Sequence, residues 1–283
     1  MVEIYGGFGN QIYQLLQANE LSKLGFKVYV NTRDFKRVAK ENADHLTARK
    51  LVLPVNFFNL EEVGSQKFLK YRIRRILRNL KIFNKITLND KFFNLLNDNN
   101  IKNTELKKNN YFIGHWQSFN NLENSYEYLS KSLSNHPLLK NSLSSHNKSN
   151  STMIHVRRGD YLKFKEELPI FYYEKSIEFI KNKTKTTNFK IYTDDVNWCK
   201  NQKLFTIADE ILTSSDSPDD TVKTFGSMLN HQNYIIANST FSLIAAFLGS
   251  SEDSLVAYPH PWFKERNYNK NIVNPNWEKI KYI

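Results

Sequence analysis

Apolar residues in the first part of the chain change between the spacing of strands and the spacing of a helix. The short apolar run at residues 2–5 predicts a strand, and residues 11–24 carry apolar positions at helical spacing. Residues 27–31 and 111–114 predict two further strands. Strands that alternate with helical segments are typical of α/β domains, so we expect the first half of the chain to form one.

The same alternation restarts in the second half. Strands are predicted at residues 152–156, 189–193, 234–237 and 255–258, and helices at residues 171–181, 221–229 and 241–248. Residues 141–151 are rich in Ser and Asn and carry no apolar face, which indicates an interdomain linker. We therefore expect an α/β fold with two Rossmann-type domains, residues 1–148 and 149–283, that face each other across a ligand-binding cleft.

The predicted strand at residues 152–156 leads into two consecutive arginines, Arg157 and Arg158. A guanidinium binds phosphate oxygens in pairs and stays charged at physiological pH, so this strand end indicates an anion site. Side chains alternate along a strand, which points His155 and Arg157 to one face and Arg158 to the other. We predict that Arg157 binds phosphate and that Arg158 anchors the turn, in one interpretation through Asp160. The alternative is a surface ion-pair cluster.

A glycine-rich turn, Gly6-Gly-Phe-Gly-Asn-Gln11, lies between the first predicted strand and the first helix. Such a turn lets a ligand approach the backbone and the positive end of the helix, which makes Gly7 and Gly9 candidate binding residues. It is not the dinucleotide fingerprint, because Ile12 stands in place of the last glycine. A tight structural turn is the alternative. Asn10 is then either a helix cap or a hydrogen-bonding group that faces the cleft.

Two polar segments follow later strands. Asp194 and Asp195 are adjacent on an extended segment and therefore point to opposite faces, so we expect helix capping rather than a metal site. The second segment consists of Asn238, Ser239, Thr240 and Phe241, at the start of a predicted helix. In one interpretation it offers hydroxyl and backbone N–H donors to an anion, and in the other it only caps the helix.

Composition narrows the class of partner and the compartment. The chain has 283 residues and a formal net charge of +12, which favours anionic partners such as nucleotide phosphates, nucleic acid or acidic lipid. Its one cysteine, Cys199, cannot form an internal disulfide and is expected to be a buried apolar residue in a reducing compartment. No apolar run reaches the roughly 18 residues that span a bilayer, and the start lacks a signal-peptide pattern. We expect a cytoplasmic protein.

Residues 67–85 carry eight basic residues and no acidic residue, with apolar residues at helical spacing on one face. A surface helix packed on its own domain explains this pattern. The alternative is a peripheral contact with anionic headgroups at the inner face of a membrane. We expect no nucleic-acid partner, because no recognised nucleic-acid motif accompanies the basic residues.

Taken together, these blocks resemble glycosyltransferase family 11, the α-1,2-fucosyltransferases. The blocks are residues 6–14 and 155–161, with Tyr192-Thr-Asp-Asp195, Ile235-Ile-Ala-Asn-Ser-Thr-Phe-Ser242 and Gly114-His-Trp-Gln-Ser118. The resemblance implies a GT-B fold with an acceptor-side N-terminal domain and a GDP-sugar-binding C-terminal domain. It also implies transfer of L-fucose from GDP-β-L-fucose, with inversion and without a metal, to a galactoside hydroxyl of a glycan. The acceptor would belong to a surface polysaccharide, lipid-linked in one interpretation.

The resemblance assigns roles to the residues singled out above. The catalytic candidates are Arg157, Asn10, Asp160 and His155, and the donor-binding candidates are Gly7, Gly9, Arg158, Asp194, Asn238, Ser239, Thr240 and Phe241. Asp160, His155, His115 and Glu3 are all candidates for the base that accepts the acceptor proton.

The chain departs from the family pattern near the nucleotide. Leu243 and Ile244 stand where the family usually has two tryptophans, and Asp219 and Asp220 are the nearest candidates for an acid that holds guanine. A related GDP-deoxysugar donor therefore stays open. So does a non-catalytic nucleotide- or nucleic-acid-binding protein that retains only the phosphate site.

Overall fold

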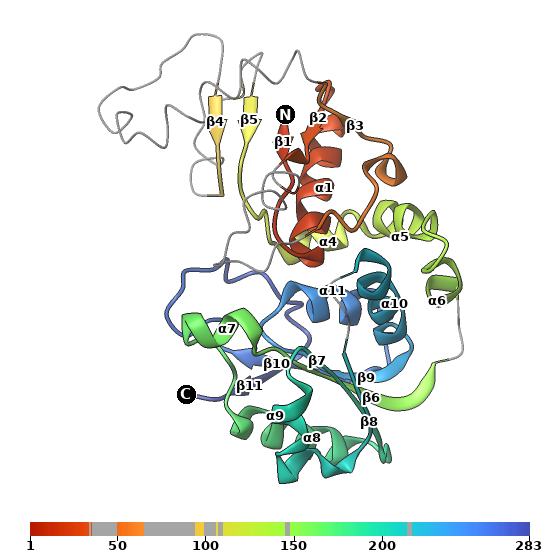
Figure 1. The fold of residues 1–283 in the computed structure, drawn as a ribbon, viewed down its shortest axis with the longest axis vertical. Helices are drawn as coiled ribbons and strands as arrows, with labels where there is room; N and C mark the ends of the chain where they lie inside the picture. Colours follow the sequence, from red (N-terminus) through yellow and green to blue (C-terminus); the bar gives the residue numbers. More distant parts are fainter. Residues whose placement is uncertain are drawn as a thin grey trace.

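The computed structural model describes residues 1–33, 35, 50–64, 94–98, 106, 110–144, 148–213 and 217–283. In this part of the chain every strand pair is parallel, and the strands form two separate sheets (Figure 1). The N-terminal sheet has the order β3-β2-β1-β5-β4 and the C-terminal sheet has the order β11-β10-β9-β6-β7-β8. The expected α/β class is confirmed.

The N-terminal sheet is built from short strands, and among the described residues helix α1 (Phe8–Lys23) packs against it. Its strands are β1 (Val2–Glu3), β2 (Tyr29–Asn31), β3 (Glu61–Glu62), β4 (Asn94–Leu96) and β5 (Asn110–Phe112). Helix α1 buries Ile12, Leu15 and Leu16 completely. These residues recur at helical spacing, and they pack with the buried Val2 and Val30 of β1 and β2 in one core cluster. The 3₁₀ helix η1 (Val55–Phe58) precedes β3.

The C-terminal sheet is longer and is covered on both faces. Its strands are β6 (Ser149–Val156), β7 (Asn188–Thr193), β8 (Ala208–Leu212), β9 (His231–Ile235), β10 (Val256–His260) and β11 (Glu278–Lys281). Six consecutive residues of β6 are buried, which is the pattern of a central parallel strand with helices on both sides. Met153 belongs to the core cluster on one face, and Ile154 and Val156 belong to a second cluster on the other.

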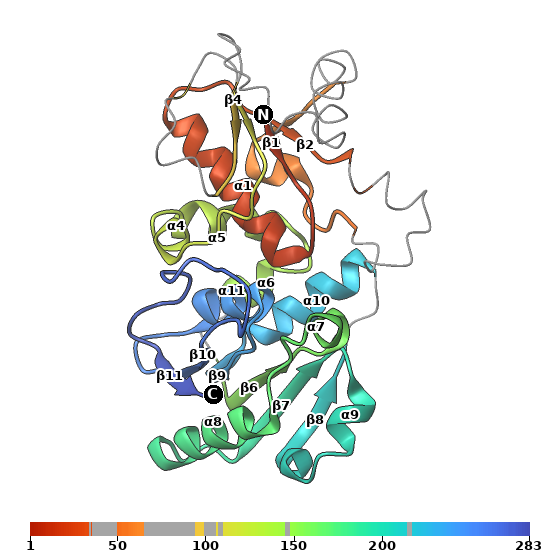
Figure 2. The ribbon, with the colours of Figure 1, turned by 90° about the vertical axis from the view of Figure 1, so that its left-hand side faces the viewer.

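The helices of the second half divide between these two faces. Helices α8 (Ile170–Lys183) and α9 (Val196–Lys200) lie on the Ile154 side, with the 3₁₀ helix η4 (Lys203–Ile207). Helices α10 (Pro218–Met228) and α11 (Thr240–Gly249) lie on the side that faces the N-terminal half in both views (Figures 1 and 2). The remaining helices are α4 (Phe119–Glu123), α5 (Tyr126–Ser134), α6 (Lys140–Ser144) and α7 (Gly159–Phe164).

One apolar core joins the two halves. The cluster that contains Ile12 and Leu16 of α1 also contains Val222 and Phe225 of α10 and Ile244 of α11. A continuous buried contact of this kind fixes the halves against each other more firmly than a polar contact would.

Most sequence-predicted elements are present, with boundaries shifted by a few residues. The linker predicted at residues 141–151 is only partly a linker, because α6 and the start of β6 occupy most of it. The sequence reasoning missed β3, β4, β8 and β11. The basic segment at residues 67–85 lies outside the described residues. Within the described part of the chain, no helix combines the length and apolar character needed to cross a membrane.

Candidate functional site

Arg157 lies where β6 enters the turn to α7. Its guanidinium pairs with the carboxylate of Asp160 and, at 2.8 Å, with Asp194 Oδ2, and the Arg157 side chain is 19% exposed. The ring centre of Tyr161 lies 5.6 Å from the guanidinium carbon. Burial disfavours the cation, but the carboxylates of Asp194 and Asp160 outweigh burial and raise the pKa of Arg157. Arg157 is therefore a fixed, permanently charged group.

Arg158 points away from Arg157, as the alternation of a strand requires. Its Nε lies 3.1 Å from Asp195 Oδ2, and its guanidinium stacks on the Trp198 ring with the carbon 4.0 Å from the ring centre. These contacts tie the end of β6 to α9. The anchoring partner is thus Asp195; the interpretation that used Asp160 is wrong, because Asp160 pairs with Arg157.

The two adjacent aspartates serve different partners, as expected for neighbours on an extended segment. Asp194 Oδ1 accepts a hydrogen bond from the backbone N–H of Arg158 at 2.8 Å, and a Cβ at Gly159 would lie 2.6 Å from Asp194 Oδ2. Asp195 caps α9 by accepting from the Trp198 N–H at 3.0 Å. Among the described residues, no group of three or more His, Cys, Asp or Glu could hold a metal ion.

The glycines of the first turn have different structural roles. Gly6 has a φ of 79°, in the left-handed region that glycine tolerates best. Gly7 precedes α1, and a Cβ built there meets no described atom within 4 Å. Gly9 is buried against α11, where a Cβ would lie 2.7 Å from the carbonyl carbon of Thr240. Gly9 therefore permits two helices to approach, which explains this position by packing.

Asn10 connects three segments that are distant in the sequence. Its Oδ1 accepts hydrogen bonds from Gln117 Nε2 at 2.9 Å and from Thr240 Oγ1 at 3.3 Å. The helix-cap interpretation of Asn10 is wrong, because α1 begins at Phe8 with Gly7 in the cap position. Asn10 instead lies at the junction of the N-terminal and C-terminal halves.

The segment before α11 is fixed from both sides. Ser239 caps the helix by accepting from the Phe241 N–H at 3.4 Å. Asn238 is completely buried, and its side-chain Nδ2 donates to the backbone carbonyl of Glu166 at 2.8 Å. The backbone carbonyl of Asn238 accepts from Tyr161 Oη at 2.8 Å. The Arg157 turn and the start of α11 are thereby held together.

Glu166 is a functional candidate that sequence reasoning missed. Its carboxylate is completely buried and accepts backbone N–H groups from Lys264 at 2.7 Å, Glu265 at 3.3 Å and Arg266 at 3.2 Å. It therefore fixes the turn that follows β10 beside α7. Nothing in the local sequence distinguishes this buried acid from its exposed neighbours.

Apart from Asp160, which pairs with Arg157, the candidates for the base differ in environment. Burial, reinforced by the charge of Arg157, lowers the pKa of His155 to about 3, and its Nδ1 has no hydrogen-bond partner among the described residues. Glu3 is buried and accepts from Tyr111 Oη at 2.6 Å. His115 is exposed, and its ring centre lies 5.2 Å from that of Tyr5. Although part of the residue is open to solvent, the groups packed around its imidazole displace enough water to lower the pKa of His115, against the opposing charge of Asp98.

Asp98 and Gln14 support the loop that carries His115, and neither was a candidate from the sequence. Asp98 accepts from the backbone N–H groups of His115 at 2.8 Å and Trp116 at 2.7 Å. Gln14 accepts from the Tyr5 N–H at 2.9 Å and donates to the Gly114 carbonyl at 3.1 Å. The available signal in the sequence was a glutamine between the apolar positions Ile12 and Leu16 of the predicted helix, since buried amides are normally fully bonded.

The structure thus brings most of the sequence candidates to one place. The first turns of α1 and α11 meet there, with the rings of Phe8 and Phe241 5.6 Å apart. The ring of His155 lies 6.0 Å from that of Phe241, which joins the arginine turn to the same junction. Arg158 is the exception, because its guanidinium is directed toward α9.

Parallel sheets with charged and polar residues at the carboxyl ends of their strands define a Rossmann-like protein of the kind that binds nucleotides. The chain belongs to Glycosyl transferase family 11, whose family model matches residues 50–281. The resemblance inferred from the sequence blocks is confirmed, and the chain is a glycosyltransferase of polysaccharide synthesis.

Two curated relatives come from Escherichia coli. An alpha-1,2-colitosyltransferase is 27% identical over 99% of this chain and 98% of its own length. The O-antigen biosynthesis glycosyltransferase WbnK is 34% identical over 45% of this chain and 44% of its own length. No solved structure matches the chain.

Proposed function

We propose that the protein transfers L-fucose from GDP-β-L-fucose to a galactoside hydroxyl, most simply the 2-hydroxyl, of a surface glycan. The observation that carries the proposal is the meeting of Asn10, Thr240 and the Arg157 turn at the junction of the two halves. The two parallel sheets support a GT-B arrangement, with residues 1–148 on the acceptor side and residues 149–283 on the donor side. Donor and acceptor would then meet between the halves.

Arg157 is suited to the leaving group. When the bond between the anomeric carbon and the β-phosphate oxygen breaks, the electron pair stays on GDP and the sugar becomes positively charged. A guanidinium already fixed by Asp160 and Asp194 needs no reorganisation to stabilise the developing charge. The N–H groups at the start of α11 offer further donors to the diphosphate. In this scheme the protein supplies the positive charge and no metal is required.

The residue that takes the proton of the acceptor hydroxyl must be accessible to the acceptor and unprotonated near neutral pH. A group with a pKa of about 3 accepts protons poorly near neutral pH, which argues against His155. Glu3 is buried and already bonded to Tyr111. His115 is exposed, has a lowered pKa and is therefore neutral near pH 7, and it lies on the acceptor side beside Tyr5. We favour His115 for receiving the acceptor proton, with Asp160 as the competing candidate.

A second donor is supported by the similarity to an alpha-1,2-colitosyltransferase along nearly the whole chain. Colitose is L-fucose without the 3-hydroxyl. A site built to hydrogen-bond that hydroxyl rejects the deoxy analogue strongly, whereas an apolar site does not reject the hydroxylated sugar with comparable strength. A direct comparison of GDP-fucose and GDP-colitose therefore decides which sugar the site is built for.

Release of GDP from each donor by the purified protein tests the proposal. A panel of β-galactosides would be supplied one at a time, with and without EDTA. We expect release that requires an acceptor, survives EDTA and is faster with GDP-fucose. The product linkage is then assigned by NMR.

Three outcomes contradict separate parts of the proposal. Loss of activity in EDTA that Mg²⁺ or Mn²⁺ restores would show that a metal is required. Faster turnover of GDP-colitose would replace fucose as the donor sugar. Absence of GDP binding by calorimetry would overturn the donor site itself.

A further inference from the structure

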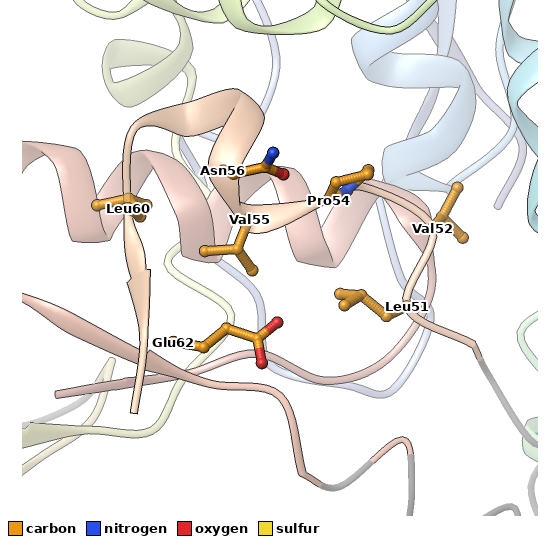
Figure 3. Close-up of a pocket in the computed structure, with 7 residues that line it drawn as sticks. All are labelled: Leu51, Val52, Pro54, Val55, Asn56, Leu60 and Glu62. Carbon is orange, nitrogen blue, oxygen red and sulfur yellow. The ribbon is translucent and has the colours of Figure 1, made fainter. Parts of the chain in front are cut away.

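A pocket of about 470 Å³ lies on the N-terminal half, between η1, β3 and the start of α1 (Figure 3). Its volume is in the ordinary range for small-molecule sites. Seven residues line it: Leu51, Val52, Pro54, Val55, Asn56, Leu60 and Glu62. Of these seven, Glu62 alone carries a charge, and Asn56 supplies the only side-chain amide. The other five side chains form apolar walls.

Strand register explains why a carboxylate enters this apolar pocket. In the parallel pair of β2 and β3, Tyr29 lies opposite Glu61 and Val30 lies opposite Glu62. Paired residues of neighbouring strands point to the same face, and Val30 is buried in the core beneath α1. Glu62 therefore points to the α1 side and lines the open edge of the pocket, where Figure 3 shows its carboxylate turned toward Leu51, and the residue as a whole stays exposed to solvent. Glu61 points to the opposite face.

One buried side chain attaches the pocket to the catalytic junction. Gln11, in the first turn of α1, donates from Nε2 to the Gly6 carbonyl at 3.0 Å and to the Lys50 carbonyl at 2.8 Å. Its Oε1 accepts from the Val52 N–H at 2.9 Å. The pocket wall at Leu51 and Val52 is thus connected to the glycine turn by two hydrogen bonds, one between Val52 and Gln11 and one between Gln11 and Gly6. Gln11 is completely buried, so this attachment is rigid.

The chemistry of the pocket selects among ligands. Glu62 is the single charged group among the described lining residues, and its carboxylate repels phosphate and other anions, although the protein as a whole carries a charge of +12. A carboxylate accepts hydrogen bonds from hydroxyl groups, an amide both donates and accepts, and apolar walls pack against C–H surfaces. Sugars present hydroxyls on their edges and C–H groups on their faces. We propose that this pocket binds a neutral sugar ring of the glycan acceptor, on the premise of the glycosyl transfer proposed above.

Two variants and a control test the assignment. Glu62→Gln keeps the shape and removes the charge, and Asn56→Trp places a large ring at the exposed rim. Glu61→Gln changes the neighbouring acid on the opposite face, near Lys27. The probes are the methyl glycosides of β-galactose, β-glucose, N-acetyl-β-glucosamine and N-acetyl-β-galactosamine, titrated by saturation-transfer NMR in the presence of GDP.

At least one of these glycosides should bind the unmodified protein. Glu62→Gln keeps an acceptor oxygen but loses its charge, so it should weaken that binding about tenfold. Asn56→Trp should abolish it, and Glu61→Gln should leave it within about twofold. The KM of the acceptor should rise in parallel, with the KM of the donor and the rate of donor hydrolysis unchanged.

The proposal is overturned if no glycoside binds while GDP does, or if the two glutamate variants behave alike. It is also overturned if Asn56→Trp leaves glycoside affinity unchanged, since Glu62 would then merely protect an exposed sheet edge. Failure of the donor proposal looks different. In that case glycosides bind in the Glu62-dependent manner and neither GDP nor a GDP-sugar binds.

Discussion

Arg157 and Arg158 show how two identical neighbours acquire different roles from the face to which each points. Arg157 pairs with Asp160 and Asp194, whereas Arg158 is fixed between Asp195 and the Trp198 ring. Both guanidiniums lose similar amounts of solvent and both have carboxylate partners. The loss of either should therefore affect folding to a similar extent, and only one loss should affect the reaction.

We expect Arg157→Ala to lower kcat by about 10²–10³, because a preorganised donor to developing charge is worth that much. The cost in unfolding free energy should be about 1–3 kcal/mol, since the largely buried carboxylates of Asp160 and Asp194 lose this partner. Initial rates and urea unfolding measure the two effects on the same preparation. Arg158→Ala is the matched control and should cost similar stability with less than about tenfold loss of kcat. Equal losses of kcat would contradict the division of roles.

His115 makes the reaction pH-dependent if it is the base. Its pKa lies below the ordinary value of 6.5, so the neutral form predominates at pH 7 and is lost only as the pH falls. We expect kcat/KM to be constant at and above pH 7 and to decline only at pH values below the ordinary pKa of 6.5. His115→Gln should lower the plateau and remove this decline. If Asp160→Asn removes the decline and His115→Gln keeps it, the base is Asp160.

At the scale of elements, the contact of α1 with α11 determines the site more than any single strand does. Gly9 and Thr240 let the two helices touch at their first turns, and Asn10 bonds across the contact. Leu243 and Ile244, which replace the tryptophans usual in the family, are completely buried on α11. These two departures therefore change the packing of the helix rather than a surface that a ligand could reach.

A methyl group at Gly9 should separate the two helices. In Gly9→Ala the new carbon would meet the Thr240 backbone at 2.7 Å, and overpacking of this kind costs about 1–3 kcal/mol. We expect lower thermal stability together with weaker GDP binding, because Asn10 and Thr240 move apart. The measurements are differential scanning calorimetry and GDP titration.

The control for this variant is Gly7→Ala, where the added carbon meets no described atom within 4 Å. Its φ of −77° suits alanine, so it should cost less than about 1 kcal/mol. If both alanine variants lose GDP affinity equally, the turn itself binds the ligand. The packing explanation of Gly9 would then be wrong.

At the scale of the whole molecule, the sequence predicts the α/β class and the central strands well. β6, β7 and β9 are mostly buried, and the apolar residues that each strand contains make it visible in the sequence without its neighbours. β3, β8 and β11 lie at or near sheet edges and expose much of their length, so strand pairing rather than apolar pattern defines them. No local pattern could have revealed these three strands.

The residues of the candidate site also include some that the sequence could place and some that it could not. Arg157 and Asp194 follow residues that are paired in register, Val156 with Thr193, so a correct sheet order already places them side by side. Asn10 with Thr240 and Glu166 with the 264–266 turn are different, because each depends on how distant loops dock. Single-chain patterns carry no information on such docking. That is why Glu166, Asp98 and Gln117 were missed.

The meeting of α1 and α11 has a further consequence for the working of the protein. Each helix start carries about half a positive charge, so two starts in contact repel each other across the junction. A diphosphate at this junction would attract both and act as an electrostatic clamp between the halves. The donor would then add an electrostatic attraction to the apolar contact that already joins the halves, and departure of GDP would remove only this added attraction.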